Sequence, residues 1–468
     1  MRKKIVGYAA TAALVASLIP FGSVAAAAPA APPVITGQPQ SASVKFERAA
    51  HFKVRATGSP KPQYQWQVSG DGGPFSDVGS PSSKLSVTAT TANDESVYRV
   101  VVSNPSGAVT SASATLTIAP SVASTKAKPL IDGLIDKGVQ APYDASQSFP
   151  VTPTSELAGY ATAFSGTVLN LTWSQLEPTE GGFDFAPLDA DLASVSAYNA
   201  ANPTQPLKGK LRVWGGFTAP QWAKALDGTP IAVPGDTNRP DAASLGRYWM
   251  NDYEQQWTDL QNALAKRYDQ DPLLSEVAVS SCNTETDEPF VMTETEIQAL
   301  LAAGWTSADQ EQCLEGALAG YSAWKHTAVD FTFNGFSDVS STGTRSPDDA
   351  VTADIMSQCA SAEITGVLPL CILDNHGLQD SVSPQQALLY SSIDSLWQQF
   401  DHDVPVDFQT FSPNVDLCQT IGVGIAYHAQ SVEVWPPGPG FPGFQQYNAV
   451  QLTAWDEALK QQTQPTCD

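Results

Sequence analysis

Residues that can hydrogen-bond to hydroxyls or stack on sugar rings recur directly after short apolar runs in the C-terminal two-thirds of the chain. Indole faces stack on sugar rings, while carboxylates and amides form hydrogen bonds with hydroxyls. Carboxylates can also transfer protons. Together these residue types predict a cleft for carbohydrate. The residues in these positions are Trp173, Trp214, Glu285, Glu288, Asn334, Asp374, Asn375, His376, Gln409, Glu433 and Trp435.

Eight apolar, β-branched runs alternate with helical patterns over residues 129–468, which predicts a (β/α)8 barrel. Because the active site of such a barrel lies at the carboxyl ends of its strands, the residues that follow the runs should share one rim. The expected strands are Gly138–Ala141, Thr167–Thr172, Gly209–Trp214, Glu276–Ser281, Val329–Asn334, Val367–Leu373, Val406–Phe411 and Ser431–Trp435. The expected helices include Leu245–Tyr268, Gln310–His326, Asp348–Ala362, Pro384–Phe400 and Ala449–Gln462.

Three segments of the predicted barrel resemble the clan A glycoside hydrolases, especially the β-galactosidase-like ones. Residues 171–185, LTWSQLEPTEGGFDF, are similar to a segment that follows the second strand in that clan, and residues 212–222, RVWGGFTAPQW, to its third strand. Asp287-Glu288-Pro289 is similar to the Asn-Glu-Pro motif of the fourth strand, with Asp in place of Asn. The resemblance implies hydrolysis of a glycosidic bond by two carboxylates at the rim.

The resemblance makes Glu288 the expected acid/base residue. Glu285 is its rival, because Asn283-Thr284-Glu285 also places a carboxylate after an Asn. In clan A the nucleophile is a Glu at the end of the seventh strand, where this chain has the neutral Gln409. Glu433, at the end of the eighth strand, is the best remaining partner.

Two other acids are weaker candidates for the second carboxylate. Asp374 follows the sixth strand, and Asp407 lies two residues before Gln409, one layer deeper. A carboxyl separation of about 5 Å would favour retention and one of about 6.5–9.5 Å inversion. The alternative is a glycan-binding or adhesive surface protein whose barrel lacks the nucleophile.

Residues 33–118 are rich in Val, Thr and Ser and form short alternating runs separated by turn signals, which predicts an antiparallel β-sandwich. They resemble an immunoglobulin-like domain of the bacterial surface type. Trp66 is similar to its buried strand-C tryptophan, and Asp94 and Tyr98 to its tyrosine corner. Val54 and Val100 stand where the usual disulfide would be. The immunoglobulin-like domain is either a spacer or an adhesive or carbohydrate-binding unit, and its sequence leaves both roles open. Residues 119–128 are expected to be a linker.

The chain is strongly acidic, with 24 Lys plus Arg, 48 Asp plus Glu and a formal net charge of −24 in 468 residues. Nucleic-acid binding rests on clustered basic charge, so this balance excludes nucleic acid as the main partner. Residues 1–28 carry a basic start, an apolar stretch and small residues, which predicts a cleaved signal peptide and a secreted protein. We expect no membrane span in the mature chain; its partner would be a carbohydrate substrate or a cell-surface glycan.

Six cysteines, all in the barrel segment, favour three disulfides in an exported chain. Neighbours along the chain suggest Cys282 with Cys313, Cys359 with Cys371, and Cys418 with Cys467, among fifteen possible connectivities. The sequence contains neither a CxxC pair nor HExxH, and no dinucleotide or phosphate-loop motif. We therefore expect no metal and no cofactor.

Overall fold

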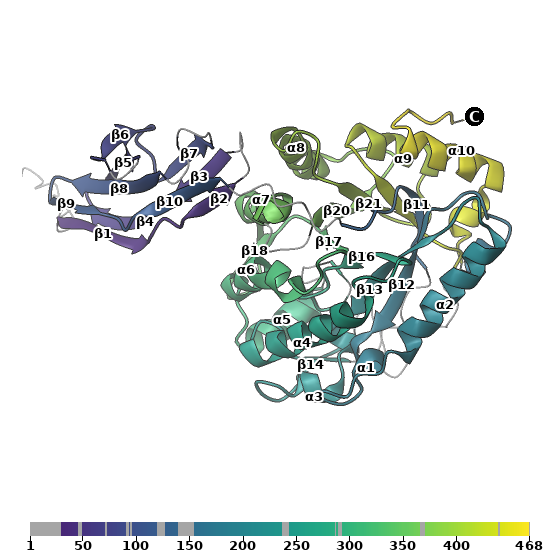
Figure 1. Cartoon of the computed structure of the whole chain (residues 1–468). Helices are drawn as coiled ribbons and strands as arrows, with labels where there is room; N and C mark the ends of the chain where they lie inside the picture. Colours follow the sequence, from purple (N-terminus) through teal and green to yellow (C-terminus); the bar gives the residue numbers. More distant parts are fainter. Residues whose placement is uncertain are drawn as a thin grey trace, which may run out of the picture. The chain divides into compact units, whose positions relative to one another are not determined.

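The computed structural model divides the chain into two compact units, with the boundary between Ala119 and Pro120 (Figure 1). The predicted signal peptide, Asp94 and most of the predicted linker lie outside the described residues. The structure describes residues 30–44, 49–70, 73–89, 93, 96–118, 127–138, 154–235, 243–285, 287–288, 293–365, 370–438 and 440–467.

The N-terminal unit is a β-sandwich, as predicted. Alternate residues of its strands are buried, so Trp66 and Tyr98 meet in one core with Val54 and Val100. The two valines thus fill the place of the usual disulfide by packing. The strands are β1 (Ala31–Gly37), β2 (Ala42–Val44), β3 (Ala49–Lys53), β4 (Arg55–Ser59), β5 (Gln63–Ser69), β6 (Ser76–Val78), β7 (Lys84–Thr88), β8 (Val97–Asn104), β9 (Gly107–Thr110) and β10 (Ala114–Ile118).

The C-terminal unit is a closed parallel barrel of eight strands, which confirms the predicted fold class. Figure 1 shows helices outside the ring of strands. The barrel strands are β11 (Gly133–Asp136), β12 (Gly166–Thr172), β13 (Lys208–Trp214), β16 (Leu274–Ala278), β17 (Ala328–Thr332), β20 (Cys371–Leu378), β21 (Val406–Thr410) and β22 (Ser431–Val434).

The prediction of the first strand was wrong, because β11 ends at Asp136, two residues before the expected start at Gly138. Gly138 has a positive φ of 69°, and its N–H donates to the Asp136 carboxylate at 3.0 Å, so the chain turns there. The sixth strand also differs from its predicted bounds, Val367–Leu373. β20 starts at Cys371, and Val367 lies outside the described residues.

The helices follow the predicted order. The two largest errors in their predicted bounds are the start of one helix and the end of another. The helix expected from Leu245 begins at Asn251, because Leu245 ends β15 (Ala243–Leu245), which pairs with β14 (Ile231–Val233). The helix expected over Gln310–His326 is α6, which ends at Gly316 and continues as a 3-10 turn. The helices are α1 (Trp173–Leu176), α2 (Ala186–Ala201), α3 (Gln221–Lys224), α4 (Asn251–Tyr268), α5 (Glu294–Ala302), α6 (Ser307–Gly316), α7 (Asp349–Thr365), α8 (Pro384–Gln399), α9 (Leu417–Ala426) and α10 (Ala449–Lys460).

Charged residues occupy the centre of the barrel, where bulky aliphatic residues usually dominate. Alternate residues of a strand face the same side, so Lys210 and Arg212 of β13 occupy successive interior layers. Lys210 contacts Asp330 of β17 and Glu433 of β22, and all of these side chains are buried. The interior therefore holds a network of ion pairs beneath the rim.

All three suggested cysteine pairings are confirmed: Cys282–Cys313, Cys359–Cys371 and Cys418–Cys467. Among the helices that the structure describes, none combines the length and apolar character needed to cross a membrane.

Candidate functional site

A cavity of about 770 Å³ opens at the carboxyl ends of the barrel strands. Eight of the eleven residues singled out in the sequence line it, because the parallel strands bring their ends to one rim. The exceptions are Trp173, Asp374 and Glu433. The eight lining residues are Trp214, Glu285, Glu288, Asn334, Asn375, His376, Gln409 and Trp435.

Trp173 is a core residue and not a sugar platform. Its side chain is fully buried and packs edge-to-face against Trp222, Tyr253 and Trp257. Its indole N–H donates to Glu177 at 2.8 Å. Since neither its face nor its N–H is open to the cavity, we remove Trp173 from the set of sugar contacts.

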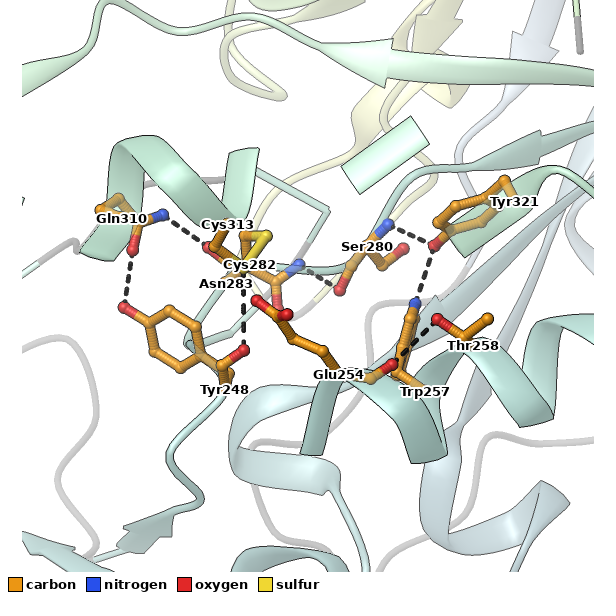
Figure 2. Close-up of a disulfide and its surroundings, with 10 residues drawn as sticks. All are labelled: Tyr248, Glu254, Trp257, Thr258, Ser280, Cys282, Asn283, Gln310, Cys313 and Tyr321. Atoms are coloured by element: carbon orange, nitrogen blue, oxygen red, sulfur yellow. Dashed lines mark hydrogen bonds between the residues drawn. A yellow bond between two sulfur atoms is a disulfide. The ribbon is translucent and has the colours of Figure 1, made fainter. Parts of the chain in front are cut away.

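The loop after β16 carries Glu285, Asp287 and Glu288 to the rim, and a disulfide anchors its start (Figure 2). Cys282 is bonded to Cys313 of α6, and its carbonyl accepts a hydrogen bond from Gln310 Nε2 at 2.7 Å. The loop is therefore fixed to α6 both covalently and by a side-chain hydrogen bond.

The same loop is tied to the segment after β13. Phe217 N–H donates to the carbonyl of Thr284 at 2.9 Å. Gly216, with a φ of +50°, permits this approach, because a Cβ there would lie 2.0 Å from Thr284 O. Residues 212–222, one of the three segments on which the family resemblance rests, thus contact the loop that carries Glu288.

His376 links Glu288 to the barrel interior. Burial alone would lower the pKa of His376, but the charges of Asp287 and Asp374 and its hydrogen bonds raise it to about 10. At neutral pH both ring nitrogens therefore carry protons. Nδ1 donates to Glu288 Oε1 at 3.0 Å, and Nε2 donates to Asp374 Oδ2 at 2.9 Å. Asp374 thus orients the histidine that holds Glu288.

Glu433 lies beneath the cavity and does not line it. Arg212 Nη2 donates to both carboxylate oxygens of Glu433, at 2.8 and 2.9 Å, and Lys210 Nζ lies 2.8 Å from Oε1. Although burial opposes ionisation, these two cations hold the pKa of Glu433 below its usual range. Arg212 itself lines the cavity, so it separates Glu433 from a ligand.

Gln409 takes the rim position on β21 and lies in register with Glu433 of β22. Its side chain is buried, and within the described residues its Oε1 has no hydrogen-bond partner. Asp407, two residues earlier, lies deeper, with an oxygen 4.0 Å from Lys210 Nζ. The strand expected to carry a nucleophile therefore offers an amide to the cavity.

Sequence reasoning missed three cations that line the cavity: Lys137, Arg212 and Arg345. Lys137 Nζ lies 3.7 Å above the Trp435 ring, and burial, with the charge of Arg212, lowers the pKa of Lys137 to about 8. Lys137 was missed because the first strand was misplaced. For Arg212, the available signal was the alternation of Lys208, Lys210, Arg212 and Trp214 within one strand.

Three buried carboxylates deeper in the barrel could hold a cation: Glu276, Asp330 and Asp407. One oxygen from each lies within 4.8 Å of the others. Burial, with repulsion from neighbouring carboxylates, raises the pKa of all three. Lys210 already contacts Asp330, so protons together with this lysine can account for the charge of the group.

Comparisons with known proteins bear mainly on the N-terminal unit. Residues 32–104 match the family described as Immunoglobulin domain. Endoglucanase C from Cellulomonas fimi is 38% identical over 86 residues, which are 18% of this chain and 8% of that protein. The chain thus spans less than a tenth of that relative, and 86 residues are far fewer than a barrel requires.

Among solved structures, titin domain M7 is 30% identical over 20% of this chain and 99% of that chain, with a TM-score of 0.17. Titin M4 is 20% identical over 20% of this chain and all of that chain, also with a TM-score of 0.17. Scores this low carry no argument. The family match and the strand pairing make the first unit an immunoglobulin-like β-sandwich.

Proposed function

We propose that the barrel is a glycoside hydrolase that binds a poly- or oligosaccharide in the 770 Å³ cavity. The observation that carries this proposal is that Glu288 lines the same cavity as Trp214 and Trp435. Tryptophan faces suit sugar rings, and the amides of Asn334 and Asn375 suit hydroxyls. The weak similarity to an endoglucanase agrees with this substrate class.

Glu288 is the proposed proton-transferring residue. Its side chain is 18% exposed, whereas those of Asp287, Asp374 and Glu433 are at most 3% exposed, so it is better placed to reach a ligand. The hydrogen bond from His376 fixes the position of one carboxylate oxygen of Glu288. A glycosidic oxygen held against it would receive the proton as the bond breaks.

We also propose that the chain is exported. Three disulfides suit an oxidising compartment, and the first 28 residues have the pattern of a signal peptide. The immunoglobulin-like unit would then act as a spacer outside the cell or hold the barrel near its glycan.

The test is a screen of the purified full chain against plant, fungal and bacterial polysaccharides, from weakly acidic to weakly basic pH. We expect new reducing ends with at least one substrate and none with Glu288→Gln. Glu457→Gln, an exposed change on α10, is the matched control and should behave like the unmodified chain. Absence of reducing ends with every substrate would overturn the proposal.

A second function, glycan binding without cleavage, is favoured by one observation. The rim of β21 carries the neutral Gln409, and Glu433 is bound to Arg212 beneath the cavity. In that case Glu288→Gln would keep the affinity for a polysaccharide, and neither form would cut it. Turnover by the unmodified chain would contradict this alternative.

A further inference from the structure

The cavity poses a problem for hydrolysis by two opposed carboxylates. That mechanism needs one carboxylate on each side of the scissile bond. Among the described residues, the cavity is lined by the carboxylates of Glu285, Asp287, Glu288 and Asp349. The first three share one loop, and Asp349 is an exposed residue at the start of α7.

The part of the rim formed by β20, β21 and β22 directs no carboxylate into the cavity within the described residues. There β20, β21 and the end of β22 contribute Asn375, His376, Gln409 and Trp435 to the cavity. Glu433 could enter only if Arg212 released both of its oxygens. Within the described part of the chain, that side of the cavity therefore provides no second carboxylate to attack the sugar.

We propose that the substrate itself supplies the attacking group, as the carbonyl oxygen of a 2-acetamido substituent. This inference rests on the proposed function and makes the substrate class the glycosides of N-acetylated amino sugars. Substrate-assisted hydrolysis of this kind is an established alternative to an enzyme nucleophile. It requires one acid and, beside it, one carboxylate that receives the N–H of the acetamido group.

Asp287 is placed for that second task. It precedes Glu288 in the same loop and lines the same cavity. Arg212 Nε donates to Asp287 Oδ2 at 2.6 Å, and His376 Nε2 lies 3.7 Å from the same oxygen. Within the described residues Oδ1 makes no hydrogen bond, so it can accept the acetamido N–H.

The reaction then balances without a further reactant besides water. Glu288 gives its proton to the glycosidic oxygen, the bond from C1 to that oxygen breaks, and the alcohol leaves. The acetamido carbonyl oxygen bonds to C1, which forms a cyclic oxazolinium ion whose N–H faces the negative charge of Asp287.

In the second step Glu288 takes a proton from water, and the water oxygen attacks C1. The bond from C1 to the acetamido oxygen breaks, the acetamido group is restored and the configuration at C1 is retained. Gln409 needs no charge in this scheme, because its amide only has to hydrogen-bond the sugar. A neutral residue at the end of β21 is thereby explained.

The first test compares matched aryl glycosides in both anomeric forms, one series with a 2-acetamido group and one with a 2-hydroxyl. We expect turnover of the acetamido series only, with rates that fall steeply as fluorine atoms replace the hydrogens of the acetyl methyl. Turnover of the 2-hydroxyl series at a similar rate would overturn this inference and leave the hydrolase proposal standing. Failure with every sugar, in this test and in the polysaccharide screen, would instead overturn the proposed function and this inference with it.

The second test uses Asp287→Asn, with Asp252→Asn on the exposed first turn of α4 as the matched control. Losing the charge beside the oxazolinium should lower kcat for the acetamido substrate by on the order of 10²-fold, whereas the control should keep it. An Asp287→Asn variant that folds, as judged by its thermal midpoint, and keeps its kcat would contradict the assignment.

Because Asp287 also pairs with Arg212, the variant could fail to fold, and a measurement on the unmodified chain covers that case. A thiazoline analogue of N-acetylglucosamine copies the bicyclic intermediate. We expect it to inhibit competitively and to bind far more tightly than N-acetylglucosamine itself. Cleavage of acetamido substrates without inhibition by the thiazoline would also contradict the inference.

Discussion

Arg212 donates to both carboxylate oxygens of Glu433, at 2.8 and 2.9 Å. The Nε of the same guanidinium binds Asp287 at 2.6 Å, so one side chain couples a rim loop to the barrel centre. Glu433 is 1% exposed and is also paired with Lys210. These contacts make Glu433 an element of the scaffold.

Glu433→Gln should therefore destabilise the barrel. Removing one partner of a buried ion pair leaves uncompensated charge and costs about 3–5 kcal/mol in the free energy of unfolding. Urea unfolding of the full chain measures this. Asp189→Asn, which breaks the exposed pair with Arg267, is the matched control and should change little. Unchanged stability of Glu433→Gln together with lost turnover would instead make Glu433 a catalytic residue.

Glu288→Gln should lower turnover and leave the stability of the barrel nearly unchanged, which is the opposite of the expectation for Glu433→Gln. The change keeps the shape of the side chain, and at 18% exposure its cost to folding is small. Loss of a positioned acid should lower kcat by about 10²–10⁴-fold. Steady-state kinetics and a thermal melt on the same preparation separate the two effects. A variant with full turnover would direct attention to Glu285.

The fold could be predicted because its signals are local. Apolar runs with β-branched residues marked barrel strands such as β12, because burial on both faces of a parallel barrel favours continuous apolar runs. β11 was misplaced because it is only four residues long and stops at a turn stabilised by Asp136. A pattern this short does not distinguish a strand from the loop that follows it.

The sequence predicted which residues lie at the rim of the barrel, but it did not predict which side chains form hydrogen bonds or ion pairs with one another. Position near the carboxyl end of a strand brought Glu288, His376 and Gln409 to one cavity. The same rule failed for Trp173, since α1 begins directly at that residue and its ring packs on α4. That Glu433 meets Arg212 depends on the register and closure of the barrel, for which a single strand carries no signal.

Stability should fall as the pH rises from weakly acidic to neutral. Burial, with repulsion from Asp374, raises the pKa of Asp407 from 3.8 to about 7, although Lys210 opposes the shift; burial likewise raises the pKa of Asp136 to about 7. Between pH 3.8 and about 7, Asp407 and Asp136 hold protons in the folded chain that they have lost in the unfolded chain. Their contribution to stability is thus complete below pH 3.8 and is lost as the pH rises through about 7.

Thermal midpoints measured across this range at fixed ionic strength test that slope. We expect a lower midpoint at neutral than at weakly acidic pH, and a flatter profile for Asp407→Asn, which carries no ionisable group at that position. Asp252→Asn, on an exposed turn, is the control and should keep the slope of the unmodified chain. A midpoint that rises throughout the range would show that the buried carboxylates stay ionised.

The two tryptophans that the sequence treated alike should respond differently to substitution. Trp435 lines the cavity with Lys137 above its ring, so Trp435→Ala should raise KM or Kd for the glycan by removing a stacking surface. Trp173→Ala should cost about 3–5 kcal/mol of stability, because the ring is fully buried among three aromatic neighbours. Sugar binding measured well below the melting temperature should be unchanged in Trp173→Phe, which keeps an aromatic ring in the core. Weaker binding by a stable Trp173→Phe variant would return Trp173 to the site.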